Sequence, residues 1–240
     1  MDETRIQRIP APLLAWYEAH KRDLPWRENP TPYRVWVSEI MLQQTRVEAV
    51  KEYYLRFMRA LPTVEDLASC EEEKLLKLWE GLGYYSRVRN MQKAARQLLI
   101  YHGGEFPSDK KTLQTLAGIG SYTAGAIASI AFGKRESAVD GNVLRVLSRV
   151  LEDGTPISDT AHRKEIEQTL SRAYPPRGIC VRRLRKAFSS WARSFANRKT
   201  PIAGIARSHS FARRRKTARK RCIPYYRKRK KNGWNGCSSF

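Results

Sequence analysis

The chain has 240 residues, 41% of them hydrophobic and 10% aromatic, which is enough for one large core or two smaller ones. Its formal net charge of +23 is typical of proteins that bind nucleic acid. No stretch approaches the roughly 18 consecutive apolar residues of a membrane span, and the opening MDETRIQRIP lacks the apolar core of a secretory signal. These features argue against a membrane or secreted protein and predict a cytoplasmic one.

The positive charge is concentrated in the last quarter of the chain. Residues 1–176 contain 25 Lys and Arg and all 23 acidic residues, so their net charge is only +2. Residues 177–240 contain 21 Lys and Arg and no acidic residue, and they include the runs RRRKTARKR and RKRKK. Like charges at this density repel one another in a compact fold. We therefore expect a boundary at Pro176, followed by a basic, mostly disordered tail at 177–240, in which only short apolar pieces such as Leu184, Phe188 and Trp191 dock weakly.

Residues 1–176 are predicted to be helical throughout, because apolar residues recur at helical spacing between glycine, proline and polar stops, with almost no strand-like alternation. The fold class is therefore all-α. Two capping boxes are predicted at Thr45 and Ser69, where a glutamate follows three positions later. After a first helix near 13–17, the expected helices cover about 33–44, 45–60, 69–81, 86–102, 121–132, 141–151 and 161–173.

A candidate phosphate-binding hairpin lies at residues 116–125, LAGIGSYTAG. Gly118 and Gly120 form a tight turn directly before a helix, and the positive end of a helix dipole attracts anions. The G-x-G spacing taken alone favours the alternative of a plain helix–helix turn. The hairpin becomes a functional prediction only together with the other motifs.

Two carboxylates are the candidate catalytic groups. Asp140, in the sequence VDGNV, directly precedes a predicted helix, where an ordinary N-terminal cap is the alternative role. Glu39 lies between Val37 and Ile40 on an otherwise apolar helix, with a surface position as its alternative. A carboxylate among apolar neighbours is costly to ionise, which favours a proton donor at neutral pH.

A glycine turn at 81–87, GLGYYSR, presents two neighbouring aromatic side chains. Tyr85 is equally compatible with a core position that caps the next helix. Tyr84 is the stronger functional candidate of the two.

Taken together and in order, these motifs resemble the helix-hairpin-helix DNA glycosylases, and the adenine DNA glycosylase branch in particular, with an endonuclease III-like fold. The resemblance covers roughly residues 10–175. The matching segments are LPWR at 24–27, PYRVWVSEIMLQQT at 32–45, GLGYYSRVRN at 81–90, HGGEFP at 102–107, LAGIGSYTAGAI at 116–127 and AVDGNVLRVLSR at 138–149.

The resemblance implies removal of adenine mispaired with 8-oxoguanine or guanine, after the base is flipped out of duplex DNA into a pocket between two helical subdomains. Glu39 is implied to protonate the adenine ring at N7, and Asp140 to stabilise the oxocarbenium-like sugar. Tyr122 and Asn142 are implied to be supporting polar groups. The partner is double-stranded DNA, and the resemblance implies a monomer associated with a bacterial-type nucleoid.

The implied contacts to DNA come from several of the matching segments. Gln44 and Tyr84 match residues that wedge into the base stack, and Trp26 and Arg27 match the pocket wall. The full set of implied DNA-binding residues is Trp26, Arg27, Gln43, Gln44, Tyr84, Gly118, Gly120 and Thr123.

Tyr122 separates two branches of the family. Related bifunctional glycosylases carry a lysine at this position, whose amine attacks the sugar and forms a Schiff base. Tyrosine cannot form one, so the resemblance implies a monofunctional glycosylase and disfavours a pyrimidine-removing enzyme with lyase activity.

The resemblance also predicts the subdomains. Residues 31–133 correspond to the helical barrel subdomain, with the helix-hairpin-helix motif at 116–125. Residues 1–30 and 134–176 correspond to part of the second subdomain. Because the family's closing helices are not recognisable after Pro176, we expect this subdomain to be incomplete, with apolar surface exposed near Leu13, Trp16 and Val146.

Family members bind a 4Fe-4S cluster through four cysteines spaced C-x6-C-x2-C-x5-C. The four cysteines here, Cys70, Cys180, Cys222 and Cys237, do not reproduce that spacing or any close metal-binding one. Free thiols in a reducing compartment are therefore expected, with no metal site and no cluster.

Two histories explain the break near Arg177. A shift of reading frame explains the loss of similarity, the absence of acidic residues and the basic composition together, and a fusion to a genuine basic DNA-binding tail is the alternative. A second functional hypothesis follows, in which the chain is an inactive remnant that binds DNA non-specifically through its tail.

Overall fold

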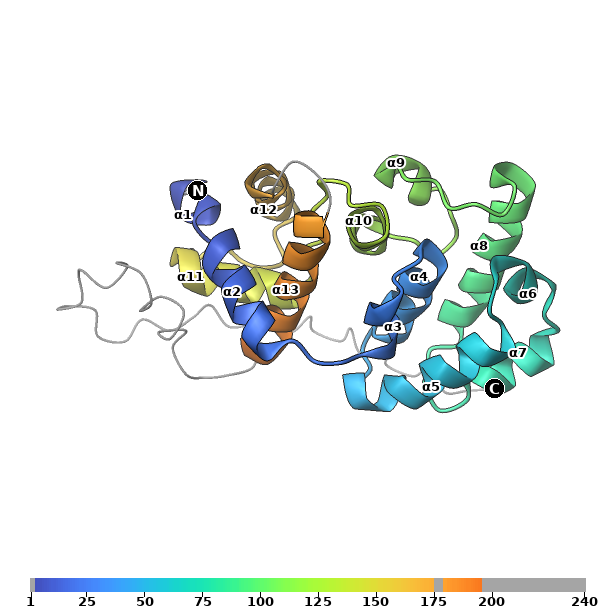
Figure 1. Cartoon of the computed structure of the whole chain (residues 1–240). Helices are drawn as coiled ribbons and strands as arrows, with labels where there is room; N and C mark the ends of the chain where they lie inside the picture. Colours follow the sequence, from blue (N-terminus) through green and yellow to red (C-terminus); the bar gives the residue numbers. More distant parts are fainter. Residues whose placement is uncertain (1–2, 175–178, 196–240) are drawn as a thin grey trace, which may run out of the picture.

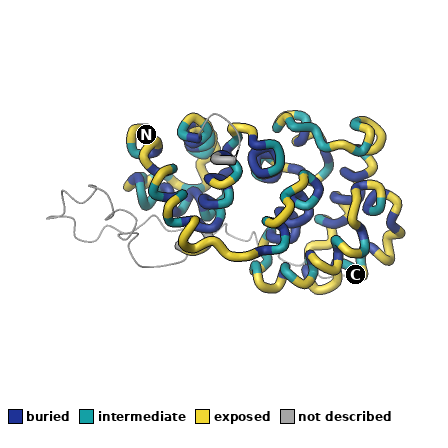
Figure 2. The backbone as a smooth tube through the Cα atoms, viewed as in Figure 1, coloured by how far each residue is buried: buried dark blue, intermediate teal, exposed yellow. Residues whose placement is uncertain are grey.

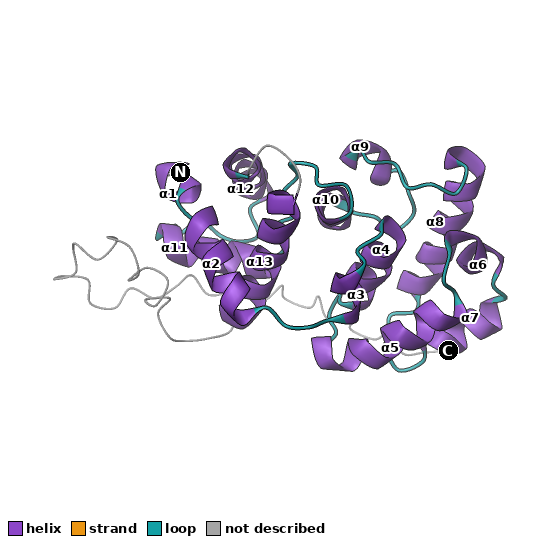
Figure 3. Ribbon diagram, viewed as in Figure 1, coloured by secondary structure: helices purple, strands orange, loops and turns teal. Residues whose placement is uncertain are grey.

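The computed structural model describes residues 3–174 and 179–195, and within these ranges every regular element is a helix (Figure 3). The all-α prediction is confirmed. No helix in the described ranges has the length and apolar character needed to cross a membrane. In chain order the helices are α1 (Glu3–Gln7), α2 (Pro10–His20), α3 (Pro25–Glu28), α4 (Pro32–Met41), α5 (Val47–Ala60), α6 (Val64–Ser69), α7 (Glu72–Trp79), α8 (Ser86–His102), α9 (Lys110–Leu113), α10 (Ser121–Ile130), α11 (Gly141–Leu151), α12 (Thr160–Ala173) and α13 (Ile179–Phe195).

The helices form two lobes, each with its own apolar core (Figures 1 and 2). The first core extends from Leu24 to Ala138 and is built by α3 to α10. The second combines side chains of α1 and α2 with side chains between Val139 and Ala192, from α11, α12 and α13. The chain therefore begins in the second lobe, builds the first, and returns to complete the second.

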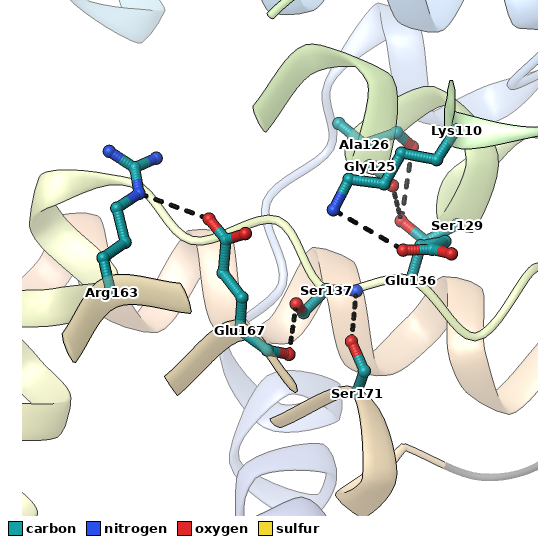
Figure 4. A network of polar contacts seen from close by, with 9 residues as sticks. All are labelled: Lys110, Gly125, Ala126, Ser129, Glu136, Ser137, Arg163, Glu167 and Ser171. Carbon is teal, nitrogen blue, oxygen red and sulfur yellow. Dashed lines mark hydrogen bonds and ion pairs between the residues drawn. The ribbon is translucent and has the colours of Figure 1, made fainter. Parts of the chain in front are cut away.

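The returning segment is tied to α12 and α9 by polar contacts (Figure 4). The Ser137 amide donates to Oγ of Ser171 at 3.1 Å, and the Ser137 hydroxyl donates to the Glu167 carbonyl at 2.7 Å. Nζ of Lys110 lies 3.5 Å from a carboxylate oxygen of Glu136. These contacts fix the segment that leads directly into Asp140.

Helix α13 differs from the sequence-based expectation of a disordered tail from residue 177. Its apolar residues recur at helical spacing and are buried in the second core, namely Val181, Leu184, Ala187, Phe188 and Trp191. They pack beside Leu13 and Val146, which are 1% and 0% exposed, and Trp16 is half-buried. The expected apolar surface is therefore covered, because an amphipathic pattern can fold onto a core despite a high overall charge. Residues 196–240, the rest of the predicted tail, lie outside the described residues.

The expected capping boxes at Thr45 and Ser69 are also absent. Helices α5 and α7 start after Arg46 and Glu71, with no hydrogen bond from a capping side chain. The reciprocal pair forms instead at Thr63, whose side chain accepts from the Asp66 amide while Asp66 accepts from the Thr63 amide. An aspartate at the third position of α6 therefore closes the capping box here, where the expected boxes had a glutamate.

Candidate active site

The hairpin between α9 and α10 has the geometry that its glycines predict. Gly118 has a φ of +73°, which favours glycine, and the Ile119 amide closes the turn by donating to the Leu116 carbonyl at 3.1 Å. Gly120 is the N-cap of α10 and provides no side-chain cap. The first amides of α10 therefore have no capping side chain in front of them, and both glycines are exposed. This helix start is suited to an anionic oxygen.

Thr123 does not present its side chain at this surface. It is only 2% exposed and belongs to the buried side of α10. Any contact of Thr123 with a bound phosphate is therefore limited to its backbone amide.

Glu39 is a buried carboxyl group on α4. It is 7% exposed, and its Oε2 atom has no hydrogen-bond partner within the described residues. The flanking residues Val37 and Ile40 are buried as well, as the sequence pattern predicted. The Oε2 atom is therefore available for a hydrogen bond to a bound molecule.

Asp140 is the N-cap of α11, so it has the capping role that the sequence offered as the alternative to catalysis. Its Oδ1 accepts from the amides of Asn142 at 3.0 Å and Val143 at 2.8 Å. The side-chain Nδ2 of Asn142 donates to Oδ2 of Asp140 at 3.4 Å, and Oδ1 of Asn142 accepts from Nη1 of Arg145 at 2.8 Å. The cap engages mainly one oxygen, and the side chain remains half-buried.

Glu39 and Asp140 lie on elements that are connected through α10 and α13. Helix α10 packs on α4, and α13 packs on both α10 and α11 (Figure 1). Tyr122, on the first turn of α10, faces α13 at the junction of the lobes, where the Arg185 guanidinium carbon lies 5.0 Å from its ring centroid. Helices α10 and α13 therefore connect the helix that carries Glu39 with the helix that Asp140 caps, and Tyr122 lies beside Arg185 between them.

Arg185 is a site residue that the sequence analysis missed, because it lies in the segment expected to be disordered. It is 0% exposed. Burial alone would lower the pKa of its guanidinium, but the electrostatic interactions with Tyr122 and Glu39 raise the pKa above its usual range. The apolar spacing of Val181, Leu184 and Phe188 was the signal that could have revealed its helix.

Arg27 and Trp26 are held in place where the two lobes meet. Nη2 of Arg27 donates to Oγ of Ser190 on α13 at 2.8 Å, and its guanidinium carbon lies 5.5 Å from the Tyr17 ring centroid. Trp26 is 7% exposed and packs edge-on against Tyr54 at a centroid distance of 5.4 Å. Arg27 thus connects the two lobes, whereas Trp26 packs in the core of the first lobe.

Gln44 and Tyr84 share an unusual backbone conformation. Their φ angles are +60° and +49°, in the left-handed region that disfavours side chains with a Cβ. Both side chains are exposed, and Tyr84 is 65% exposed. Gln43 is half-exposed, and its carbonyl is bound by Arg87, a second residue that the sequence analysis did not single out. Strained, exposed positions of this kind are concentrated at functional sites.

A 4Fe-4S cluster does not fit the described side chains. None of their His, Cys, Asp and Glu residues form a group of three or more that could hold a metal ion. Cys70 is a free, buried thiol in the first core. The side chain of Cys180 and all of Cys222 and Cys237 lie outside what the structure describes. No chemical step is therefore derived through a cluster.

Comparison with protein families gives a match over residues 37–176 to the HhH-GPD superfamily of base excision DNA repair proteins. Adenine DNA glycosylase of Homo sapiens is 49% identical over 168 residues, which cover 66% of this chain and 31% of the human protein. The enzyme of Buchnera aphidicola subsp. Baizongia pistaciae is 43% identical over 138 residues, covering 57% and 39%. The chain thus spans between a quarter and two fifths of such relatives.

Solved structures show the same fold. A thermostable thymine-DNA glycosylase superposes with a TM-score of 0.75 at 24% identity, covering 87% of this chain and 96% of that one. A trapped covalent intermediate of endonuclease III with DNA superposes with a TM-score of 0.69 at 23% identity, covering 84% and 91%. The prediction of an endonuclease III-like fold is confirmed.

Proposed function

Because the chain belongs to the HhH-GPD superfamily of base excision DNA repair proteins, we propose that it is a DNA glycosylase that removes adenine mispaired with 8-oxoguanine or guanine. The observation that carries the proposal is the buried carboxyl of Glu39, with one oxygen that has no partner in the described residues. Two relatives that are 49% and 53% identical over the matched residues are adenine DNA glycosylases.

In the proposed reaction Glu39 is the general acid. It donates a proton to N7 of the flipped adenine, which weakens the bond between the base and the sugar. A group with this role must be shielded from water and keep an oxygen available for the substrate, and the buried position on α4 meets both needs.

Asp140 is the proposed carboxylate that stabilises the positively charged sugar as the base departs. Its Oδ1 is held by two backbone amides at the start of α11, so the side chain cannot swing away. Its Oδ2 makes only the longer contact to Asn142 and is the oxygen available to the sugar. Water then attacks the sugar and completes hydrolysis of the N-glycosidic bond.

The remaining proposed contacts bind duplex DNA around the flipped base. The start of α10, behind Gly118 and Gly120, binds a backbone phosphate, and Gln44 and Tyr84 enter the base stack. Trp26 and Arg27 form the wall of the pocket. One copy of the chain contains all these groups, so the proposed enzyme acts as a monomer.

We propose a monofunctional enzyme because Tyr122 has no amine to form a Schiff base. Borohydride treatment during turnover should therefore leave no covalent protein–DNA adduct. A strong adduct formed by the wild-type chain would show that one of its amines performs lyase chemistry and would contradict this assignment.

A second candidate function is non-enzymatic DNA binding by the basic segment. The 21 Lys and Arg in residues 177–240 favour it, because phosphate contacts need only positive charge.

We also propose a reading-frame change near Arg177, which the end of the family match at residue 176 supports. The other two frames of the gene after codon 176 should then contain the cysteine pattern of the family, and its absence from both would contradict the idea.

One excision assay separates the two functions. The substrates are otherwise identical duplexes with adenine opposite 8-oxoguanine, guanine or thymine, and a duplex with an oxidised pyrimidine. We expect adenine release opposite the first two only, and no release from the oxidised pyrimidine. Tight, salt-sensitive binding without release from any duplex would support the binding function instead.

A further inference from the structure

Arg87, on the first turn of α8, binds four backbone carbonyls at once. Its Nη1 donates to the carbonyls of Ile40 and Gln43, at 2.8 Å each. Its Nη2 donates to the carbonyls of Leu82 and Gly83, at 2.9 and 3.0 Å. The first pair belongs to the end of α4 and the second to the turn after α7, so one guanidinium joins two segments about 40 positions apart.

Each of these segments continues directly into one of the two strained residues. Gln44 follows Gln43, and Tyr84 follows Gly83, and both have positive φ angles. A non-glycine residue stays in this conformation only when its surroundings hold it there. Two of the four carbonyls, those of Gln43 and Gly83, immediately precede the two strained residues, so Arg87 is placed to hold both conformations.

The rings around Arg87 extend the same connection. Its guanidinium carbon lies 5.3 Å from the Trp79 ring centroid and 5.7 Å from the Tyr84 ring centroid. Nε1 of Trp79 also donates to the Gly83 carbonyl at 3.1 Å. A planar guanidinium can stack on rings and bond in two directions, whereas a lysine ammonium cannot reproduce this arrangement.

We propose that Arg87 is a positioning residue that joins Gln44 and Tyr84 into one rigid wedge for opening the base stack. The proposal rests on the proposed function and deepens it, since it assigns the step before excision. Arg87 itself is half-buried under the wedge and acts through the two exposed side chains. Without it, two independently moving loops would lose alignment on entering the duplex, and the cost would fall on base flipping.

The test is Arg87→Lys, compared with Arg89→Lys as the matched control. Arg89 lies on the same helix, with an exposed ion pair to Glu72 at 2.8 Å. Single-turnover excision is measured on two duplexes, one with adenine opposite 8-oxoguanine and one with adenine opposite a tetrahydrofuran abasic analogue. The second adenine is unpaired and needs less help to leave the stack.

We expect Arg87→Lys to slow excision of the paired adenine by about 10-fold or more and of the unpaired adenine by less than about 3-fold. Arg89→Lys should change neither by more than about 2-fold. Equal losses on both duplexes would indicate a general structural role and would overturn the proposal. If Arg87→Lys does not fold, Tyr84→Ala and Gln44→Ala are measured instead. Each should slow excision of the paired adenine more than excision of the unpaired adenine, and equal losses on the two duplexes would overturn the proposal.

A second measurement keeps this proposal separate from the proposed function. With 2-aminopurine in place of the target adenine, fluorescence rises when the base leaves the stack, whether or not it is excised. Wild type should raise the fluorescence on binding and Arg87→Lys should raise it less. A wild type that opens the stack without excising adenine would contradict the proposed function alone, and equal fluorescence for wild type and Arg87→Lys would contradict the wedge.

Discussion

Gly118 in the hairpin lies so close to Asn90 on α8 that a Cβ added to the glycine would stand 2.8 Å from Cβ of the asparagine. The φ of Gly118 is +73°, so both the backbone conformation and the space require glycine. Gly120, two positions later, has an ordinary φ of −81°, and nothing lies within 4 Å of its added Cβ. The turn is therefore anchored at its first glycine and open at its second.

This difference predicts unequal effects of the two alanine substitutions. Gly118→Ala should lower the free energy of unfolding by about 1–3 kcal/mol, because the new methyl group meets Asn90 and the φ becomes strained. Gly120→Ala should change it by less than about 0.5 kcal/mol. Urea unfolding measures both variants, and equal destabilisation would contradict the described turn.

Asp140 has two roles that one substitution can separate. Asparagine caps helices as well as aspartate does, so Asp140→Asn should keep the free energy of unfolding within about 0.5 kcal/mol of wild type. It should nevertheless abolish adenine excision, because the sugar cation loses its counter-charge. Asp140→Ala should lose excision and also about 1 kcal/mol of stability. Undiminished excision by a folded Asp140→Asn would remove Asp140 from the proposed mechanism.

Arg185 tests whether α13 is packed as the structure shows. Arg185 is fully buried beside Tyr122 and interacts electrostatically with the buried Glu39, so removing Arg185 alone leaves its partners uncompensated. Arg185→Leu should therefore unfold at a lower urea concentration than wild type, and Arg185→Ala should cost about 2 kcal/mol or more because it also leaves a cavity. If neither variant changes the unfolding curve, α13 does not pack against Tyr122.

The segment 196–240 contains 15 Lys and Arg and no acidic residue. Removing it should weaken binding to undamaged duplex and reduce the dependence of affinity on salt, because fewer counterions are released. The single-turnover excision rate of saturated enzyme should stay within about 2-fold of the full chain, since the candidate site lies in residues 3–195. Titration across salt concentrations measures the first effect. A loss of excision in the shortened chain would mean that the tail contributes to the site.

The hairpin and the Asp140 cap could be predicted from sequence because each depends on adjacent residues. The positive φ of Gly118 favours glycine, and the cap at Asp140 requires only the backbone amides of the next helical turn. The capping boxes at Thr45 and Ser69 failed although they are equally local, because the chain at each place starts its helix one or two residues later. Local sequence patterns therefore predict that a helix starts in a segment more reliably than they predict its first residue.

The junction of the lobes could not be predicted from composition. The apolar residues Leu184, Phe188 and Trp191 predicted only weak docking, because the high charge of residues 177–240 argued against a folded helix, and the place of Arg185 beside Tyr122 was missed with it. The role of Arg87 was hidden because its four acceptors are backbone carbonyls from two distant segments, and no residue type marks them. Such contacts depend on tertiary packing.

The most direct test of the central claim is adenine release by wild type and Glu39→Gln from a duplex with adenine opposite 8-oxoguanine. Glutamine keeps the size and polarity of the side chain but cannot donate the proton, so it separates chemistry from packing. We predict release of free adenine by wild type, and a single-turnover rate at least about 1,000-fold lower for Glu39→Gln at equal DNA affinity. Equal rates for the two proteins, or no release by a folded wild type, would contradict the account.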